Sequence, residues 1–322
     1  MHVLFISAFI AAVLTSNNGF ALPAGDDRDV CPPPDRIAPC TCIRAHDSNR
    51  ITANCSNFTD ATALKNIFVK NKDWSIEDVH IDQCVMSYLP AEMLEKARFQ
   101  SLNVSFTTLY TLFDVTPVKT PELNLYLYNV KLLRGFEWKS IANSTLLELM
   151  TYNLPIKHFG KEFIDNIPKT VRGLWFDDSK TVTIAPKAFA DLPDLRYLAV
   201  TGGSLKQLNR DMFPKPTKLL YLQFSSQKIS SLPDGLLDDM DTLRMFRIEN
   251  NFLTTVSQKA FSRWVRAYGL EGNPIDCNCD IKWLTTPDGL DLSKMTGHCA
   301  QPDSMKNKKL STLQHSDFSY CK

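Results

Sequence analysis

The sequence predicts an α/β repeat protein: a solenoid with a parallel β-sheet on its concave face and a disulfide-bonded cap at each end. Two observations carry this prediction. Apolar residues recur in one pattern about every 24 residues through the middle of the chain. Of the nine cysteines, four precede that pattern and four follow it. Repeats of this kind share a continuous core, and the two open ends of the stack need covers.

The chain begins with a stretch that is typical of a secretory signal peptide, and we assign residues 1–21 to it. Residues 3–14 form an apolar run that is too short to cross a bilayer, and Gly19 and Ala21 are the small residues of a cleavage site after Ala21. A buried N-terminal helix is the alternative. No later segment is long and apolar enough to span a membrane. We therefore expect a secreted, extracellular protein with oxidised cysteines and no membrane span.

Charge and glycosylation motifs agree with export. The formal charge of +1 comes from 36 basic and 35 acidic residues, which gives no electrostatic case for nucleic acid or an anionic membrane as partner. Sequons predict glycosylation at Asn57, Asn103 and Asn143. A fourth sequon begins at Asn54, and its central cysteine should lower its occupancy.

The repeated unit fits the template L-x-x-L-x-L-x-x-N-x-L of leucine-rich repeats, with other apolar residues allowed at L. Residues 195–205, 219–229 and 243–253 match it best, and stepping back and forward gives nine units over residues 76–275. Besides the apolar side chains of the strands, a second row of buried apolar side chains is expected eighteen residues after the start of each unit. The unit starts are Ile76, Phe99, Glu122, Leu146, Val171, Leu195, Leu219, Leu243 and Val265, of which Glu122 is a polar misfit. The second row holds Leu94, Ile164, Phe189, Phe213, Leu237 and Phe261, and Pro117 and Ser140 interrupt it.

The ninth template position usually holds an Asn that satisfies backbone groups in the turn. Only Asn251 and Asn273 follow that rule, so the other turns need different partners for their backbone. Cys84 occupies this position in the first unit. It is expected to be a buried structural thiol, with an intermolecular bridge as the alternative.

Cysteine-rich caps are expected at residues 22–75 and 276–322. In the second cap, a short helix over residues 280–284 should cover the open core with Trp283 and Leu284. A zinc site made of Cys277, Cys279, His298 and Cys299 is the rival interpretation. The C-x-C spacing is tight for one tetrahedral ion, and an oxidising compartment opposes it. A redox pair would require C-x-x-C, which this segment lacks.

The two ends resemble the flanking modules of extracellular leucine-rich-repeat proteins. The resemblance implies the bridges Cys31–Cys42, Cys40–Cys55, Cys277–Cys299 and Cys279–Cys321, although the spacing from Cys31 to Cys40 is longer than the commonest form. "CPPPDRIAPCTC", Cys55, "IDQC" at the first strand and the sparse Asn positions are similar to arthropod secreted proteins of the Oplophorus-luciferin 2-monooxygenase non-catalytic subunit type. Light-emitting chemistry in that family belongs to a different, smaller chain, so the resemblance implies a non-catalytic role.

Binding is the function that the pattern favours. Metalloprotease, hydrolase, dinucleotide and P-loop motifs are missing, so we expect no enzyme, no cofactor and no metal site. Template positions three, five and seven point out from the sheet. In the central units they carry side chains that often anchor interfaces. These predicted partner-binding residues are Tyr126, Tyr128, Met150, Tyr152, Trp175, Tyr197 and Tyr221.

Several interpretations of that surface remain open. The rings could pack on each other and bind nothing, and a sugar on Asn103 would stand beside Tyr126. The main hypothesis is a secreted module that recognises an extracellular protein or glycan. The others are a non-catalytic companion of a secreted, luciferase-like enzyme chain and a structural matrix protein.

Overall fold

The computed structural model describes residues 31–44, 50–70, 74–97, 99–261 and 265–321. The described residues belong to one compact unit, Cys31–Lys322. The predicted signal peptide lies outside the described residues.

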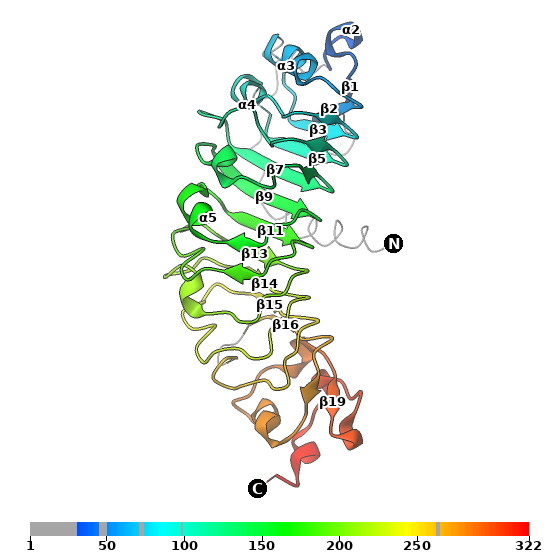
Figure 1. Cartoon of the computed structure of the whole chain (residues 1–322). Coiled ribbons are helices and arrows are strands. Elements are labelled where there is room, and N and C mark those ends of the chain that lie inside the picture. Colours follow the sequence, from blue (N-terminus) through cyan, green and yellow to red (C-terminus); the bar gives the residue numbers. More distant parts are fainter. Residues whose placement is uncertain (1–30, 45–49, 71–73, 98, 262–264, 322) are drawn as a thin grey trace, which may run out of the picture. The chain divides into compact units, whose positions relative to one another are not determined.

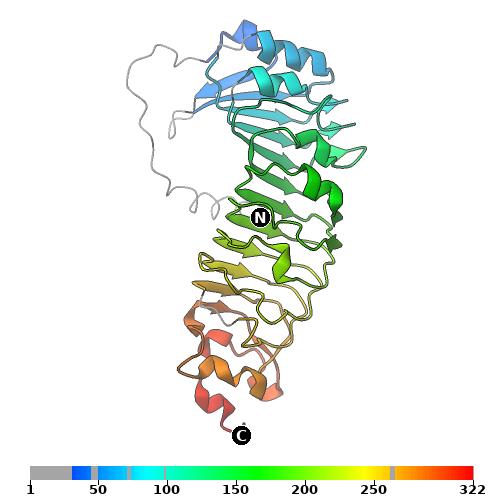
Figure 2. The ribbon, with the colours of Figure 1, turned by 90° about the vertical axis from the view of Figure 1, so that its left-hand side faces the viewer.

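A twelve-stranded sheet forms one side of this unit, and short helices and turns form the other (Figures 1 and 2). The first pair of strands is antiparallel, and all following pairs are parallel. In spatial order the strands are β1 (Thr41–Arg44), β2 (Ile51–Ser56), β3 (Asp78–Asp82), β5 (Ser101–Ser105), β7 (Leu123–Tyr128), β9 (Leu146–Tyr152), β11 (Gly173–Asp177), β13 (Tyr197–Val200), β14 (Tyr221–Gln223), β15 (Met245–Arg247), β16 (Ala267–Gly269) and β18 (Met295–Thr296).

The strand register is that of the sequence template. The third positions of consecutive units pair with each other from Asp78 on β3 to Ala267 on β16. One irregularity lies between β7 and β9, where the register shifts between Leu123 and Asn124. Leu123 is buried there while Glu122 is exposed, so Leu123 supplies the apolar side chain that the template lacks at Glu122.

The core lies between the sheet and the returning segments. The returning side holds α3 (Ala61–Lys70), α4 (Ala91–Lys96), α5 (Lys161–Asn166), η1 (Trp138–Ile141), η2 (Arg210–Met212), a small sheet of β4 (Val85–Met86), β6 (Thr108–Leu109) and β8 (Lys131–Leu132), and the pair β10 (His158–Phe159) and β12 (Thr183–Ile184).

The second inner row is buried at Leu94, Phe189, Phe213, Leu237 and Phe261, as the spacing predicts. The prediction was wrong at Ile164, which is only partly buried. Its neighbour Phe163 fills the row because α5 turns that side chain inward.

Aromatic rings fill the place where the sequence showed a gap. Trp138 on η1 is buried near the interruption at Ser140 and packs edge-on against Phe163, with ring centroids 4.6 Å apart. Phe163 continues to Phe189 at 5.4 Å, and Phe189 to Phe213 at 6.4 Å. The stack of units is therefore joined by a chain of ring contacts behind the sheet.

In at least three of the turns after the strands, the side chain at the ninth template position bonds the backbone. Asn251 Oδ1 accepts a hydrogen bond from the Ile229 amide at 3.0 Å, and Gln227 Oε1 accepts one from the Leu205 amide at the same distance. The Thr107 hydroxyl accepts from the Cys84 amide at 3.2 Å and donates to the Ser105 carbonyl at 2.8 Å. Asn, Gln and Thr thus serve one purpose in different units.

The first cap pairs β1 with β2 beside α2 (Pro34–Ile37), and its bridges join Cys31 to Cys42 and Cys40 to Cys55. In the second cap, Cys277 is bonded to Cys299 and Cys279 to Cys321. These are the pairs that the resemblance implies, and they leave no thiolates for the rival zinc site. Cys84 is the free cysteine, and it is fully buried.

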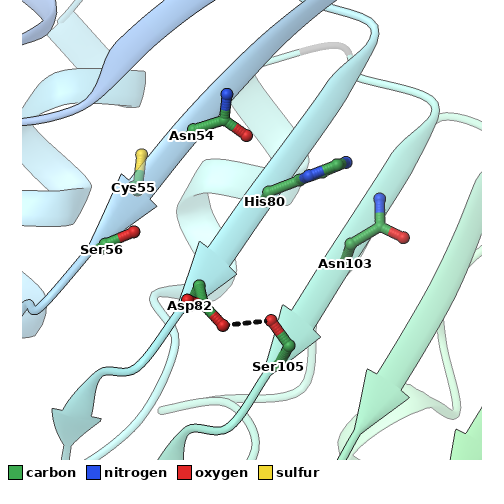
Figure 3. Close-up of a pocket in the computed structure, with 7 residues that line it drawn as sticks. All are labelled: Asn54, Cys55, Ser56, His80, Asp82, Asn103 and Ser105. Atoms are coloured by element: carbon green, nitrogen blue, oxygen red, sulfur yellow. Dashed lines mark hydrogen bonds between the residues drawn. The ribbon is translucent and has the colours of Figure 1, made fainter. Parts of the chain in front are cut away.

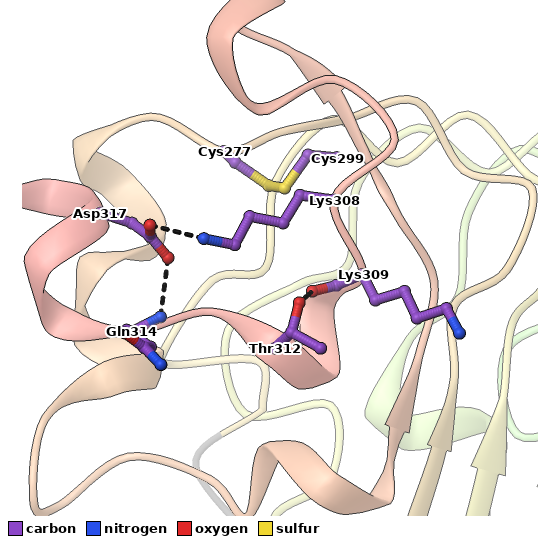
Figure 4. The surroundings of a disulfide bond; sticks show 7 residues. All are labelled: Cys277, Cys299, Lys308, Lys309, Thr312, Gln314 and Asp317. Atoms are coloured by element: carbon purple, nitrogen blue, oxygen red, sulfur yellow. Dashed lines mark hydrogen bonds and ion pairs between the residues drawn. A yellow bond between two sulfur atoms is a disulfide. The ribbon is translucent and has the colours of Figure 1, made fainter.

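The second cap covers the end of the core as expected. It holds β17 (Ile275–Asp276), η3 (Cys279–Thr285), η4 (Leu292–Lys294), β19 (Cys299–Gln301), η5 (Asp303–Met305), η6 (Leu310–Thr312) and η7 (His315–Phe318). Leu284 is buried, and the Trp283 indole donates to the Val256 carbonyl at 2.8 Å. Figure 4 shows Lys308 reaching across the cap to Asp317, whose carboxylate also accepts from the Gln314 amide at 2.8 Å.

Candidate interaction surface

The predicted partner-binding residues lie on five neighbouring strands of the sheet and share its outward face. Tyr126 and Tyr128 stand on β7, Met150 and Tyr152 on β9, Trp175 on β11, Tyr197 on β13 and Tyr221 on β14. All are partly buried except Trp175, which is buried. Strand pairing therefore brings them together, and their side-chain torsions decide which remain accessible.

One group forms a continuous row at the ends of the strands, and we call Phe106, Tyr128 and Tyr152 the aromatic row. Tyr128 and Tyr152 are stacked, with centroids 4.7 Å apart and an interplanar angle of 10°. Phe106 meets Tyr128 edge-on at 5.4 Å and is 57% exposed. Phe106 was missed in the sequence because it stands at template position eight, one residue beyond the positions expected to face outward.

Trp175 belongs less to the open surface than the sequence suggested. It stacks on Tyr197 at 5.7 Å and is only 7% exposed. Its ring lies over Gly173 so closely that a Cβ atom there would collide with it. Gly173 therefore lets the indole lie flat on the sheet, and Trp175 supports Tyr197 rather than offering a free ring.

Tyr126 is turned sideways along the sheet. Its hydroxyl donates to Glu148 Oε2 at 2.9 Å. Burial raises the pKa of Tyr126, and the nearby charge of Glu148 adds to that rise. Burial also raises the pKa of Glu148, while the hydrogen bond from Tyr126 and the charge of Arg172 oppose it. This pair holds both side chains in place at the edge of the aromatic residues.

Tyr221 is part of a polar network on β14 and β15. Its hydroxyl contacts Gln223 Oε1 at 2.5 Å, and burial raises the pKa of Tyr221 to about 12. Gln223 donates to the Ser225 hydroxyl at 3.1 Å, and Ser225 donates in turn to Glu249. Arg247 bonds the other oxygen of Glu249 at 2.6 Å. Several of the predicted contact residues thus already have partners on the sheet.

A shallow polar depression lies on the same face at the first repeats, with a volume of about 360 Å³ (Figure 3). Asp82 accepts a hydrogen bond from Ser105 within it. The pKa of His80 is lowered by loss of solvent, although the carboxylates of Asp78 and Asp82 pull it upward. The lining residues are Asn54, Cys55, Ser56, His80, Asp82, Asn103 and Ser105.

Two sequons contribute to that depression. Asn54 and Ser56 come from one, and Asn103 and Ser105 from the other. Asn103 pairs with Tyr126 in the strand register, so a sugar on its amide would rise between the depression and the aromatic residues. The other predicted glycosylation sites, Asn57 and Asn143, are exposed.

Comparison with known proteins places this surface in context. A family model described as "Leucine rich repeat" matches residues 193–253. The non-catalytic subunit of Oplophorus-luciferin 2-monooxygenase from Oplophorus gracilirostris is 24% identical over 86% of this chain and 85% of its own length. Toll-like receptor 9 from Mus musculus is 27% identical over 51% of this chain and 15% of its own length.

Another relative, leucine-rich repeat and fibronectin type III domain-containing protein 1 from Danio rerio, is 25% identical over 51% of this chain, which matches 26% of it. Among solved structures, an octameric complex of Latrophilin 3, Unc5D and the repeat domain of FLRT2 contains a chain with a TM-score of 0.55 and 18% identity. That match covers 83% of this chain and 90% of the other, and it concerns the fold. Within the described residues, no helix has the length and apolar content needed to cross a bilayer. The fold is thus that of a leucine-rich-repeat solenoid, and along most of its length the chain is similar to a non-catalytic subunit.

Proposed function

We propose that this chain is a secreted, non-enzymatic binding protein that recognises an extracellular protein or glycan through the sheet face. The observation that carries the proposal is the aromatic row: Phe106, Tyr128 and Tyr152 form one apolar strip on three neighbouring units. Tyrosine rings bury a large area with few torsions to freeze, which makes them effective anchors. Four disulfides and the similarity to a non-catalytic subunit support export and the lack of catalysis.

A second function is favoured by the long match to the Oplophorus subunit. In this second function, the chain accompanies a separate secreted oxidoreductase chain and has no catalytic activity of its own. The two proposals predict different partners for the same aromatic row. A structural matrix role, the third alternative, predicts self-association instead.

The test compares capture by two variants. The secreted chain is immobilised and exposed to extracellular fluid of the source animal, and bound proteins are quantified by mass spectrometry. Tyr128→Ser with Tyr152→Ser removes the stacked pair. The matched control carries Tyr110→Ser and Tyr320→Ser. These two tyrosines are 54% and 59% exposed and lie outside the aromatic row.

We expect a partner that binds the wild-type chain and the control but is lost from the Tyr128/Tyr152 variant. A stoichiometric oxidoreductase in that position would favour the companion function. An identical set of partners on all three proteins would refute the role of the aromatic row. Concentration-dependent sedimentation of the pure chain would point to the matrix function.

A further inference from the structure

A row of arginines follows the start of the strands in the second half of the sheet. Arg172, Arg196, Arg244 and Arg266 each stand at template position two, just before β11, β13, β15 and β16. Leu220 holds the same position before β14. We call the four arginines the arginine row. The net charge of the chain does not reveal this row, because acidic residues elsewhere balance the basic ones.

Backbone hydrogen bonds show that the arginine row is contiguous. The Arg196 amide donates to the Arg172 carbonyl at 2.8 Å, and the Leu220 amide donates to the Arg196 carbonyl at 2.7 Å. The Arg244 amide donates to the Leu220 carbonyl at 2.9 Å, and the Ala267 amide donates to the Arg244 carbonyl at 3.1 Å. Since adjacent strands are about 4.8 Å apart, the row extends over about 19 Å.

The four guanidinium groups are available. All four side chains are exposed, and within the described ranges none of them takes part in an ion pair. Asp194 lies close enough to Arg172 and Arg196 for their charges to help lower its pKa, but its carboxylate is bound by Lys218 at 2.6 Å. Glu148 is near Arg172 and is engaged by the Tyr126 hydroxyl. The local carboxylates therefore leave most of the row's charge uncompensated.

The surface next to the row suits a sugar chain. The third-position residues beside it carry no charge, and two of them are tyrosines, Tyr197 and Tyr221, whose partly buried rings lie on adjacent strands. Aromatic rings offer apolar faces to sugar rings, and guanidinium groups bind oxyanions through paired N–H donors. The full set of third-position neighbours is Gly173, Tyr197, Tyr221, Met245 and Ala267.

We propose that the arginine row is a binding site for a linear sulfated polysaccharide, laid across β11 to β16 with its sulfates on the arginines. A linear polymer fits because the four arginines follow one edge of five consecutive strands, with a gap only at Leu220 before β14. This ligand is independent of the partner proposed for the aromatic row, since the two rows lie at opposite ends of the strands. Binding to a sulfated matrix would hold the secreted chain near cell surfaces while the aromatic row remains free.

The experiment measures retention on heparin for the full secreted chain and two variants of equal charge. The first carries Arg172→Gln, Arg196→Gln, Arg244→Gln and Arg266→Gln. The control carries Lys131→Gln, Lys157→Gln, Lys206→Gln and Lys228→Gln, four exposed lysines in the segments that follow the strands of the twelve-stranded sheet. Circular dichroism establishes that each variant is folded, which exposed polar substitutions should permit.

We expect the wild-type chain and the control to bind heparin and the arginine variant to bind at least about tenfold more weakly. The slope of log K against log salt should fall by about 3 for the arginine variant, because each lost contact removes nearly one released counterion. Half-variants, Arg172/Arg196 and Arg244/Arg266, should each show about half of that fall. Equal losses in the control and the arginine variant, or none in either, would overturn the proposal.

Two further probes identify the ligand chemistry. Desulfated heparin should bind much more weakly than heparin, and polyglutamate should not compete at equal charge concentration. Equal binding of polyglutamate would replace the sulfated polysaccharide with an acidic peptide and so contradict the proposal. Loss of heparin binding with unchanged protein capture would leave the function of the aromatic row untouched.

Discussion

At the scale of single residues, Thr151 is a polar side chain at a core position that an apolar residue would fill better. It lies on β9 between Leu127 and Phe176, is fully buried, and its hydroxyl has no hydrogen-bond partner among the described residues. A buried hydroxyl without a partner costs about 1–3 kcal/mol. We expect Thr151→Val to raise the free energy of unfolding by about 1 kcal/mol in chemical denaturation. Thr107→Val, which removes a hydroxyl with two bonds, should lower it by a similar amount, and equal signs would contradict this account.

Asp177 should make the stability of the protein depend on pH. Burial raises the pKa of its carboxyl, the Thr201 hydroxyl opposes the rise, and the charge of Asp178 adds to it. The folded state therefore binds a proton more readily than the unfolded state, so this residue's contribution becomes more favourable as the pH falls through the raised pKa toward 3.8.

Relative to Asp177→Asn, the wild-type protein should gain stability between pH 7 and pH 4, as measured by melting temperature at each pH. The control is Asp194→Asn, because the hydrogen bond and charge of Lys218 lower the pKa of Asp194. That comparison should show the opposite sign at low pH. Parallel profiles for both variants would argue against burial as the cause.

At the scale of the repeated element, the eighth template position has a left-handed backbone in all nine units. The φ angles are 52° at Gln83, 45° at Phe106, 51° at Asn129, 53° at Asn153, 51° at Asp178, 66° at Gly202, 55° at Ser226, 53° at Asn250 and 74° at Gly272. Asn, Asp and Gly adopt this conformation most easily. The periodic Asn, Asp and Gly residues could have been recognised in the sequence, and Gln83, Phe106 and Ser226 would then have stood out as the three exceptions, with Phe106 the only apolar one.

Ser226 provides the test of this position because it is exposed and its side chain makes no hydrogen bond in the described structure. Ser226→Asn should raise the free energy of unfolding by about 0.5 kcal/mol, and Ser226→Val should lower it by about 1 kcal/mol or more. Denaturation midpoints of the two variants give the comparison. If Val were tolerated as well as Asn, the left-handed turn would not be a constraint on the repeat.

At the scale of the whole repeat array, the sequence predicted most of the buried positions and which residues share the outward face, but not which outward side chains stay accessible. Inward side chains must fit a core shared by neighbouring units, so their spacing fixes the strand register. The torsions of outward side chains are not fixed by the shared core. The Trp175 ring therefore packs over Gly173, and the Tyr126 hydroxyl bonds Glu148. The four arginines of the arginine row can also be found in the sequence. Only the strand pairing, which aligns them, and the lack of ion pairs to them within the described residues distinguish the row from scattered surface charge.

The repeat array also predicts which units should unfold first when one cap is destabilised. Each unit contacts mainly its neighbours, so loss of a cap should open nearby units first. The Cys279–Cys321 bridge spans 42 residues, and its removal should cost up to about 4 kcal/mol through the entropy of the unfolded chain. In hydrogen exchange, Cys279→Ser with Cys321→Ser should lose protection in β15, β16 and β18 while β3 and β5 stay protected. Cys31→Ser with Cys42→Ser should show the reverse gradient, and a uniform loss in both variants would mean that the units unfold as one body rather than in sequence from their ends.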